Sequence, residues 1–456
     1  MTRQPQLPSS FLRDCDRAMM PLSDKKKAPV WLHLGAVAQH ARGIGLVRSH
    51  KLPDALAELA GLHPGFADFA SPMPEQDAQL VEGFWAHENL PVDRWAYPLG
   101  DLYQALSVEA RKGRALCQTP WFVAELLLHL GYDRAREDWE RPRVIDPACG
   151  TGHILVESLG WMSGSDAVET LGRVTGVDLD PYAALIARYR LAVRSCVGAQ
   201  DLCHLPLRVG VANSLLDEHE LLARGAYEVV IANPPYIVVA EEKMRESIRQ
   251  RYREVCHGKY SLALPFTVLM TELAVEGGYI SQITTNAWMK REYGKPFVEN
   301  YLSRYELIWV INAAGAYIPG HGTPTCILLH RNMPATGKPA LSVLGKRGEP
   351  KTPEDPAKGL VWSSIRDAVY EVEARERLKR AMEREAEMGD AEWELDLQEL
   401  RAQAEAARAR SISDPPMYFA VGVPGDVLLE LVSRAEELAR LQQLSAAAEE
   451  ALSEPG

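Results

Sequence analysis

Four short apolar runs in the middle of this chain each end in a polar or glycine-containing segment. They cover residues 144–145, 174–177, 208–212 and 227–232. Strand-like and helix-like patterns alternate from about residue 116 to 335, which predicts an α/β fold with a mostly parallel sheet covered on both faces. Because parallel strands end at one edge of such a sheet, the segments that follow them are expected to meet there.

The segment after the first run contains two closely spaced glycines. Its sequence is Asp-Pro-Ala-Cys-Gly-Thr-Gly at residues 146–152, and a helical pattern begins near Ile154. Glycine lets the backbone approach a ligand closely, and the start of a helix offers free N–H donors. The spacing is not GxGxxG, and no Gly-Lys-Ser/Thr follows. We therefore predict a nucleotide-type pocket without a phosphate-binding loop.

Polar residues also follow the second and third runs. Asp178 and Asp180 follow the second, and an acid at this place commonly accepts hydrogen bonds from ribose hydroxyls. An Asp before a helical run more often caps that helix. We assign Asp178 to a ribose and Asp180 to the cap. Asn213 and Ser214 follow the third run and are expected at the same edge.

The fourth run leads into Asn-Pro-Pro-Tyr at residues 233–236. The two prolines restrict the backbone, so the Asn233 side chain and the Pro234 carbonyl become preset hydrogen-bond acceptors. Such acceptors suit a planar amino group, for example N6 of adenine. An ordinary Asx turn is the alternative for the tetrapeptide alone. The glycine loop upstream favours a chemical role.

In this order the motifs resemble those of the gamma-class DNA adenine-N6 methyltransferases that use S-adenosylmethionine. The similarity spans about residues 95–335. The segments 100–107, 259–262, 276–280, 285–292 and 315–325 resemble one subgroup, the phage-growth-limitation (BREX-type) enzymes. Residues 118–124 look like the family's motif X. The resemblance implies a seven-stranded, Rossmann-like methyltransferase sheet. Its last three strands are expected at 279–283, 307–311 and 326–329, the final one antiparallel.

The resemblance also implies residue roles. S-adenosyl-L-methionine is the implied cofactor, and its expected contacts are Thr119, Pro120, Asp146, Pro147, Ala148, Gly150, Gly152, Asp178, Leu179, Asn213 and Ser214. The family usually has Asp at the position of Asn213, whose carbonyl oxygen still accepts from an amine. The implied catalytic group is Asn233, Pro234, Pro235, Tyr236 and Tyr317. Asn233 and Pro234 would polarise the target amine, and Tyr236 and Tyr317 would flank a flipped adenine.

Double-stranded DNA is the implied substrate, although the chain carries 62 acidic against 50 basic residues. A DNA-binding protein usually has a basic footprint, so a local basic rim is expected. Its candidates are Lys290, Arg291, Lys295, Arg304 and the basic residues of 243–253, for which a solvated helix face is the alternative. Seven cysteines without CxxC spacing indicate neither a disulfide framework nor a metal site. His321, between two glycines, is expected to be a loop residue and not a metal ligand.

Three regions are predicted: helical residues 1–115, a catalytic domain at 116–335, and helical residues 336–456. The last contains helical patterns at 364–410 and 427–452, broken at 413–416, typical of a coiled coil or partner-binding segment. Gamma-class enzymes that act alone normally carry a large target-recognition domain here, so a protein partner supplying recognition is expected. No apolar stretch predicts a membrane anchor or signal sequence, and a cytoplasmic location is expected.

The function implied is site-specific adenine-N6 methylation of DNA in a phage-defence or restriction-modification system. Two alternatives stay open. One is a binding or scaffold module that keeps the cofactor pocket without turnover. The other is methylation of an RNA base or a protein glutamine, because those enzymes also use Asn-Pro-Pro-Tyr for a planar amino group.

Overall fold

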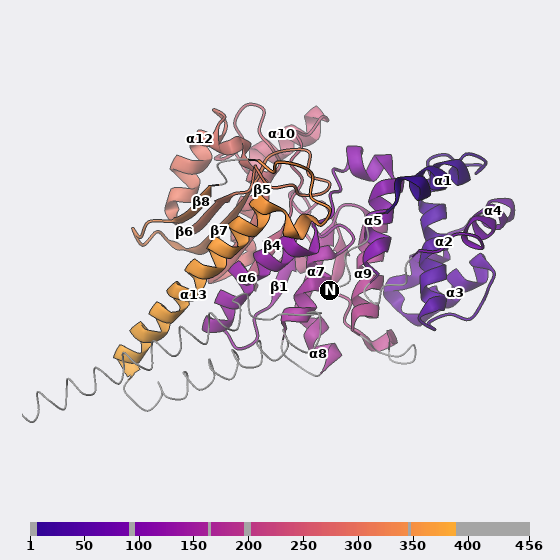
Figure 1. Ribbon diagram of the computed structural model, residues 1–456, viewed down its shortest axis with the longest axis horizontal. Coiled ribbons are helices and arrows are strands. Elements are labelled where there is room, and N and C mark those ends of the chain that lie inside the picture. The colour runs from indigo at the N-terminus through magenta and orange to yellow at the C-terminus, as the bar shows by residue number, and fades with distance from the viewer. Residues whose placement is uncertain (1–6, 91–95, 163–165, 196–201, 345–347, 389–456) are drawn as a thin grey trace, which may run out of the picture. The chain divides into compact units, whose positions relative to one another are not determined.

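The computed structural model describes residues 7–90, 96–162, 166–195, 202–344 and 348–388. The chain divides into a large unit, Thr2–Trp362, and a second unit that contains Ser363–Gly456. The large unit is built on one eight-stranded sheet with the order β3-β2-β1-β4-β5-β7-β6-β8 (Figure 1).

Five strands at one side of the sheet are parallel, and β7 runs against both of its neighbours. The predicted mostly parallel sheet with one antiparallel strand is confirmed. The strands are β1 (Val144–Asp146), β2 (Val174–Asp178), β3 (Val209–Val211), β4 (Tyr227–Ala232), β5 (Ala274–Thr285), β6 (Tyr305–Asn312), β7 (Thr325–Pro334) and β8 (Leu341–Leu344).

The predicted strand number was one too low, because β8 adds an eighth strand parallel to β6. β8 has only four residues, and they alternate between half-buried and exposed. An edge strand this short carries little apolar pattern, so its pairing with β6 decides its conformation.

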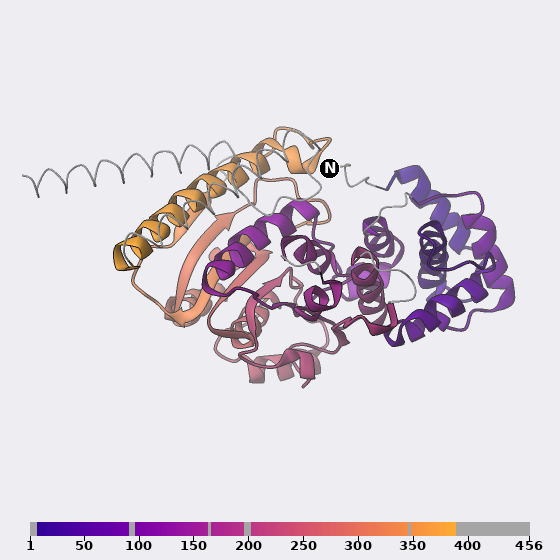
Figure 2. The same cartoon turned by 90° about the horizontal axis from the view of Figure 1, so that it is seen from below.

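Both faces of the sheet centre are covered by helices, as Figure 2 shows from below. All six residues of β4 are buried. Val229 and Ile231 lie on the face where Gly131 of α6 (Trp121–Asp138) approaches the sheet. Val230 and Ala232 pack in the cluster that includes α11 (Ala263–Leu273). This two-sided burial explains why β4 is a continuous apolar run and not an alternating one.

Helix α2 (Ala28–Gly43) packs against α9 (Pro181–Arg194) through two matched polar pairs. His33 Nδ1 lies 2.7 Å from Tyr182 Oη, and His40 Nδ1 lies 2.7 Å from Tyr189 Oη. Both pairs repeat after seven residues, two turns of each helix, so α2 and α9 contact each other along one face. Figure 1 shows α1 to α4, in indigo, gathered beside α5 and α9.

The helices of the large unit are α1 (Ser9–Met19), α2 (Ala28–Gly43), α3 (Leu52–Leu62), α4 (Glu75–Trp85), α5 (Tyr97–Leu106), α6 (Trp121–Asp138), α7 (His153–Trp161), α8 (Ala167–Gly172), α9 (Pro181–Arg194), α10 (Glu242–Arg251), α11 (Ala263–Leu273) and α12 (Gly294–Pro296). Helix α13 (Leu360–Met388) continues into the second unit and agrees with the helical pattern that begins near residue 364. The predicted break at 413–416 and the helix at 427–452 lie outside the described residues. Within the described ranges, every helix is too short or too polar to cross a membrane.

Candidate active site

The carboxyl ends of β1 to β4 surround a cavity of about 380 Å³. Nine residues of the predicted cofactor set line it: Thr119, Asp146, Pro147, Ala148, Gly150, Asp178, Leu179, Asn213 and Ser214. Asn233 and Pro235 line it as well. Pro120 instead lines a second cavity. Gly152 does not line the cavity, and it precedes α7 with φ +82°. The meeting of strand ends at one edge follows from the parallel topology.

The glycine loop closes one wall of the cavity at Gly150. This residue has φ +53°, and a Cβ there would lie 2.9 Å from Leu116 Cδ1. Its N–H donates to Asp178 Oδ2 at 2.7 Å, which ties the loop to the end of β2. The positive φ is what favours glycine at this position, and a methyl group there would also push the end of the Leu116 side chain aside.

Two buried carboxyl groups mark one end of the cavity. Asp146 Oδ1 accepts from the Ala148 N–H at 2.9 Å, and Asp178 Oδ1 accepts from the Asp180 N–H at 2.8 Å. Burial raises the pKa of Asp146 to about 8, with the Asp178 charge adding to the effect. Burial likewise raises the pKa of Asp178 to about 6. A cationic ligand group beside Asp146 would favour its ionised form and be held by it.

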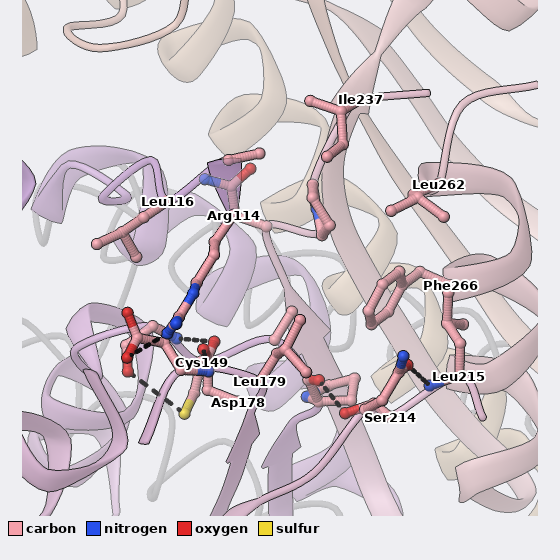
Figure 3. A pocket seen from close by; sticks show the side chains of 18 of the residues that line it. Arg114, Leu116, Cys149, Asp178, Leu179, Ser214, Leu215, Ile237, Leu262 and Phe266 are labelled. Atoms are coloured by element: carbon pink, nitrogen blue, oxygen red, sulfur yellow. Dashed lines mark hydrogen bonds and ion pairs between the residues drawn. The ribbon is translucent and has the colours of Figure 1, made fainter. Parts of the chain in front are cut away.

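Asp180 caps α9 and forms an ion pair with an arginine at the rim of the cavity. Its Oδ1 accepts from the Tyr182 N–H at 3.0 Å, so the predicted cap is confirmed. The same carboxylate pairs with Arg114 at 2.7 Å and accepts from Tyr103 Oη at 2.7 Å. Figure 3 shows the Arg114 side chain reaching down toward Cys149 and Asp178.

Sequence reasoning did not identify Arg114 as a cavity residue. It precedes Ala115, a non-glycine residue with φ +56°. Only the turn after the helical segment Glu109–Gly113 brings the guanidinium to the cavity. A single arginine outside any motif carries no signal for this placement.

The other end of the cavity is apolar. Its walls include Leu215 beside Ser214, Ile237 after the Asn-Pro-Pro-Tyr segment, and Leu262 and Phe266 around the start of α11 (Figure 3). A polar end with two carboxyls and an apolar end suit a ligand with a cationic group and a flat ring. Phe266 was not identified from the sequence, because an apolar residue on a core helix has the same pattern whether or not it borders a cavity.

The Asn233 amide is held in one orientation. Its Nδ2 donates to the Cys117 carbonyl and to Thr119 Oγ1, both at 3.1 Å. A carbonyl oxygen only accepts, so the NH2 group must face Cys117. Tyr236 Oη donates to Asn233 Oδ1 at 2.7 Å. An amide oxygen has two lone pairs, so Oδ1 has the capacity to accept one further hydrogen bond.

The structure does not bring Tyr317 into the cavity that Asn233 lines. Tyr317 is 36% exposed and borders a second cavity of about 570 Å³, together with Pro120, Trp121 and Phe122. Its predicted stacking on a base stays a prediction. His321, four residues later, is instead close to the site, with Nε2 3.3 Å from Asn233 Nδ2. The described residues contain no group of three or more metal-ligating side chains.

The basic residues expected around the cleft differ in their surroundings. Lys290 and Arg291 are exposed. Arg304 instead forms an ion pair with Glu254 at 3.0 Å, and Arg249 pairs with Glu246 at 2.6 Å. Those two cations are partly neutralised on the protein itself.

Comparison with known proteins agrees with the sequence motifs. Residues 173–318 match the Eco57I restriction-modification methylase family. Over 330 residues the chain is 37% identical to the adenine-specific methyltransferase PglX of Streptomyces coelicolor, which covers 59% of this chain and 27% of that protein. Over 204 residues it is 24% identical to the Type II methyltransferase M.BstVI of Geobacillus stearothermophilus, covering 40% of this chain and 36% of that protein. The chain thus spans about a third or less of these relatives.

Two solved structures share the fold. The Type IIL restriction-modification enzyme MmeI, solved in complex with DNA, superposes with a TM-score of 0.51 at 12% identity, over 76% of this chain and 60% of that one. The Type IIG restriction endonuclease BpuSI gives a TM-score of 0.50 at 17% identity, over 71% and 39%. The resemblance stated from the sequence is confirmed by the family match and by the similarity to PglX.

Proposed function

Because residues 173–318 carry an Eco57I-type restriction-modification methylase domain, we propose that this protein methylates N6 of adenine in DNA with S-adenosylmethionine. One observation carries the proposal. The Asn233 amide, fixed at the end of β4, lies on the wall of a cavity that has carboxyl groups at one end and apolar side chains at the other. The chain covers only part of its relatives, so the activity is proposed for this site and not transferred from them.

The cavity fits the chemical parts of this cofactor. Asp146, Ala148 and Thr119 would hold the amino-acid end, where a cation meets a carboxyl group whose pKa burial raises to about 8. Asp178 would accept from the ribose hydroxyls. Asn213 would accept a hydrogen bond from the adenine amine of the cofactor. The apolar side chains that line the rest of the cavity would enclose the adenine ring: Leu179, Leu215, Pro235, Ile237, Leu262 and Phe266. When bound, the cofactor supplies a methyl group on a positively charged sulfur.

The residues of the Asn-Pro-Pro-Tyr segment would activate the target amine. An exocyclic amine conjugated with its ring is a poor nucleophile. Asn233 Oδ1 and the Pro234 carbonyl would accept its two hydrogens and stabilise the positive charge that develops on nitrogen during attack. Burial raises the pKa of Tyr236 well above its usual value, so the phenol stays protonated and remains a donor to Asn233. No nucleophilic side chain and no general base is needed for the transfer itself, and the methylated, positively charged nitrogen then loses one proton to water.

Access to N6 in a duplex requires the base to be flipped out. Tyr236 would form one wall of the base site, and Tyr317 would meet the base from the outer side, where it is about a third exposed. Exposed Lys290 and Arg291 are the proposed phosphate contacts.

We propose a three-part organisation, with the catalytic domain at 116–335 between helical regions at 1–115 and 336–456. A protein partner supplying target recognition, and a role in phage defence or restriction-modification, complete the proposal. The restriction-modification role is supported by the family match of residues 173–318. The phage-defence role and the partner follow from the resemblance stated from the sequence.

The test is transfer of tritiated methyl from S-adenosylmethionine to unmethylated bacterial DNA. Wild type is compared with Asn233→Ala, and the product is located by nucleoside digestion. Loss of one preorganised polar contact is expected to reduce kcat by roughly 100- to 1,000-fold. Asn300→Ala, at an exposed position outside the cavity, is the matched control. Cofactor binding without any transfer, also in the presence of the partner proteins, would support a binding module and refute the proposal.

A further inference from the structure

His321 contacts the amide to which the proposed function assigns catalysis. Its Nε2 lies 3.3 Å from Asn233 Nδ2, and its ring packs against the Tyr236 ring with 5.9 Å between the centroids. His321 does not line the cavity proposed for the cofactor. It reaches that cavity only through two residues that line it, Asn233 and Cys117, and so contacts the catalytic segment from behind the cavity wall.

The surroundings of the imidazole select one tautomer. Nδ1 lies 3.2 Å from the Pro319 carbonyl oxygen and 3.5 Å from Cys117 Sγ. Because a carbonyl oxygen only accepts, Nδ1 carries the proton of the neutral ring. Nε2 then presents a lone pair toward the NH2 group of Asn233. Burial lowers the pKa of His321, which keeps the ring neutral near pH 7.

The loop that carries His321 is built to pass close to Cys117. Gly320 has φ +79°, and a Cβ there would lie 3.3 Å from Cys117 Sγ. Burial raises the pKa of the Cys117 thiol to about 12, so no thiolate forms to draw a proton from the imidazole. The Cys117 carbonyl, on the same residue, accepts from Asn233 Nδ2. Cys117 thus contacts both the Asn233 amide, through its carbonyl, and the His321 ring, through its sulfur.

We propose that His321 is a positioning residue for methyl transfer. Its Nε2 lone pair joins the Cys117 carbonyl and the Thr119 hydroxyl around Asn233 Nδ2, whose two hydrogens are shared among the three acceptors. With acceptors on this side only, Oδ1 stays turned toward Tyr236 and the target amine. A flipped amide would present NH2 to an amine that also donates, and the stabilisation of developing positive charge would be lost. The inference rests on the proposed function, because it assigns a partner to the group that performs it.

Three variants test the inference: His321→Leu, His321→Gln and His257→Gln. Leu removes the acceptor, whereas the Gln side-chain oxygen can reach the place of Nε2. His257 is exposed and serves as the matched control. We expect His321→Leu to lower kcat by roughly 10- to 100-fold, because displacing a catalytic group slightly costs this much, with the dissociation constant of the cofactor unchanged. His321→Gln is expected to recover most of that loss, and His257→Gln to behave as wild type.

A measurement independent of turnover separates this inference from the proposed function. In protein labelled with 15N at Asn and His, the 15N chemical shifts of the His321 ring should show that Nδ1 carries a proton and that Nε2 does not. The Asn233 side-chain resonances, assigned by their loss in Asn233→Ala, should shift in His321→Leu but not in His257→Gln. Unshifted Asn233 resonances, wild-type kcat in His321→Leu, or a proton on Nε2 overturns the inference. A wild type that transfers no methyl to DNA, also in the presence of the partner proteins, refutes the proposed function, while the NMR spectra still decide the His321 contact.

Discussion

Binding of the cofactor should release a proton from Asp146. Burial raises the pKa of this carboxyl group to about 8 in the free protein, so at pH 7 it is protonated in about nine of ten molecules. A cationic group bound beside it requires the ionised form. The carboxyl group must therefore lose its proton when the amino-acid end of the cofactor binds.

The size of the effect follows from proton linkage. An acid of pKa about 8 that is fully ionised in the complex releases about 0.9 proton at pH 7, and raising the pH from 6.5 to 7.5 increases the association constant roughly eightfold. The sign is positive because the free state binds more protons than the complex. Asp178, whose pKa is raised only to about 6, releases about 0.1 proton at pH 7 and contributes little in this range.

Isothermal titration calorimetry measures the release directly. Cofactor is titrated at pH 7 in phosphate and in Tris, because the difference in buffer ionisation enthalpy reveals the number of protons exchanged. Asp146→Asn should abolish the release and flatten the pH dependence, and Asp178→Asn should leave most of the release intact. If wild type binds cofactor with the same heat in both buffers, Asp146 is not the group that meets the cationic end of the cofactor.

Three further predictions concern binding and stability. Gly150→Ala should weaken cofactor binding at least tenfold, measured by the same calorimetry, because residue 150 has φ +53° and the added methyl would press on Leu116; unchanged affinity would contradict the role of the loop. Phe266→Ala should weaken the binding free energy of the cofactor by about 1 to 2 kcal/mol, because the contact with its ring is lost. Phe69→Ala, a buried control away from the cavity, should destabilise the fold but leave the affinity of the folded protein unchanged. Burial lowers the pKa of His33 to about 4, whereas the unfolded chain takes up this proton near pH 6.5. The free energy of unfolding therefore falls by about 1.4 kcal/mol per pH unit as the pH drops from about 6.5 toward 4. Urea unfolding at pH 6.5 and 5.5 should show a smaller pH dependence in His33→Gln, and an identical dependence would refute the assignment.

Local patterns were sufficient for the strands that end in the active site. β4 was predicted from six consecutive residues, since a strand buried on both faces needs an apolar side chain at nearly every position. The glycine loop was predicted because backbone conformations with positive φ leave a direct trace in the sequence. The cap by Asp180 was predicted for a similar reason, since it is completed two residues along the chain.

Contacts between distant segments were not predictable in this way. β8 is a strand only because β6 pairs with it, and Phe266 borders the cavity only because α11 lies next to the Asn-Pro-Pro-Tyr segment. Tyr317 and His321 show the limit most clearly. The motif drew attention to Tyr317, but the fold of their shared loop places His321 against Asn233 and leaves Tyr317 at a second cavity.

By itself, the sequence determined the order of strands and helices, the identity of the polar groups at the strand ends, and the chemistry those groups support. These properties depend on residues within a few positions of one another, where side-chain pattern and backbone preference act directly. The tertiary structure alone decided which groups share a cavity, which carboxyl group is buried enough to hold a proton near pH 8, and which side chains orient the Asn233 amide. Those properties depend on exclusion of water and on contacts between segments far apart in the sequence, 116 residues for Asn233 and Cys117 and 204 for Cys117 and His321. Neither is encoded at any single position.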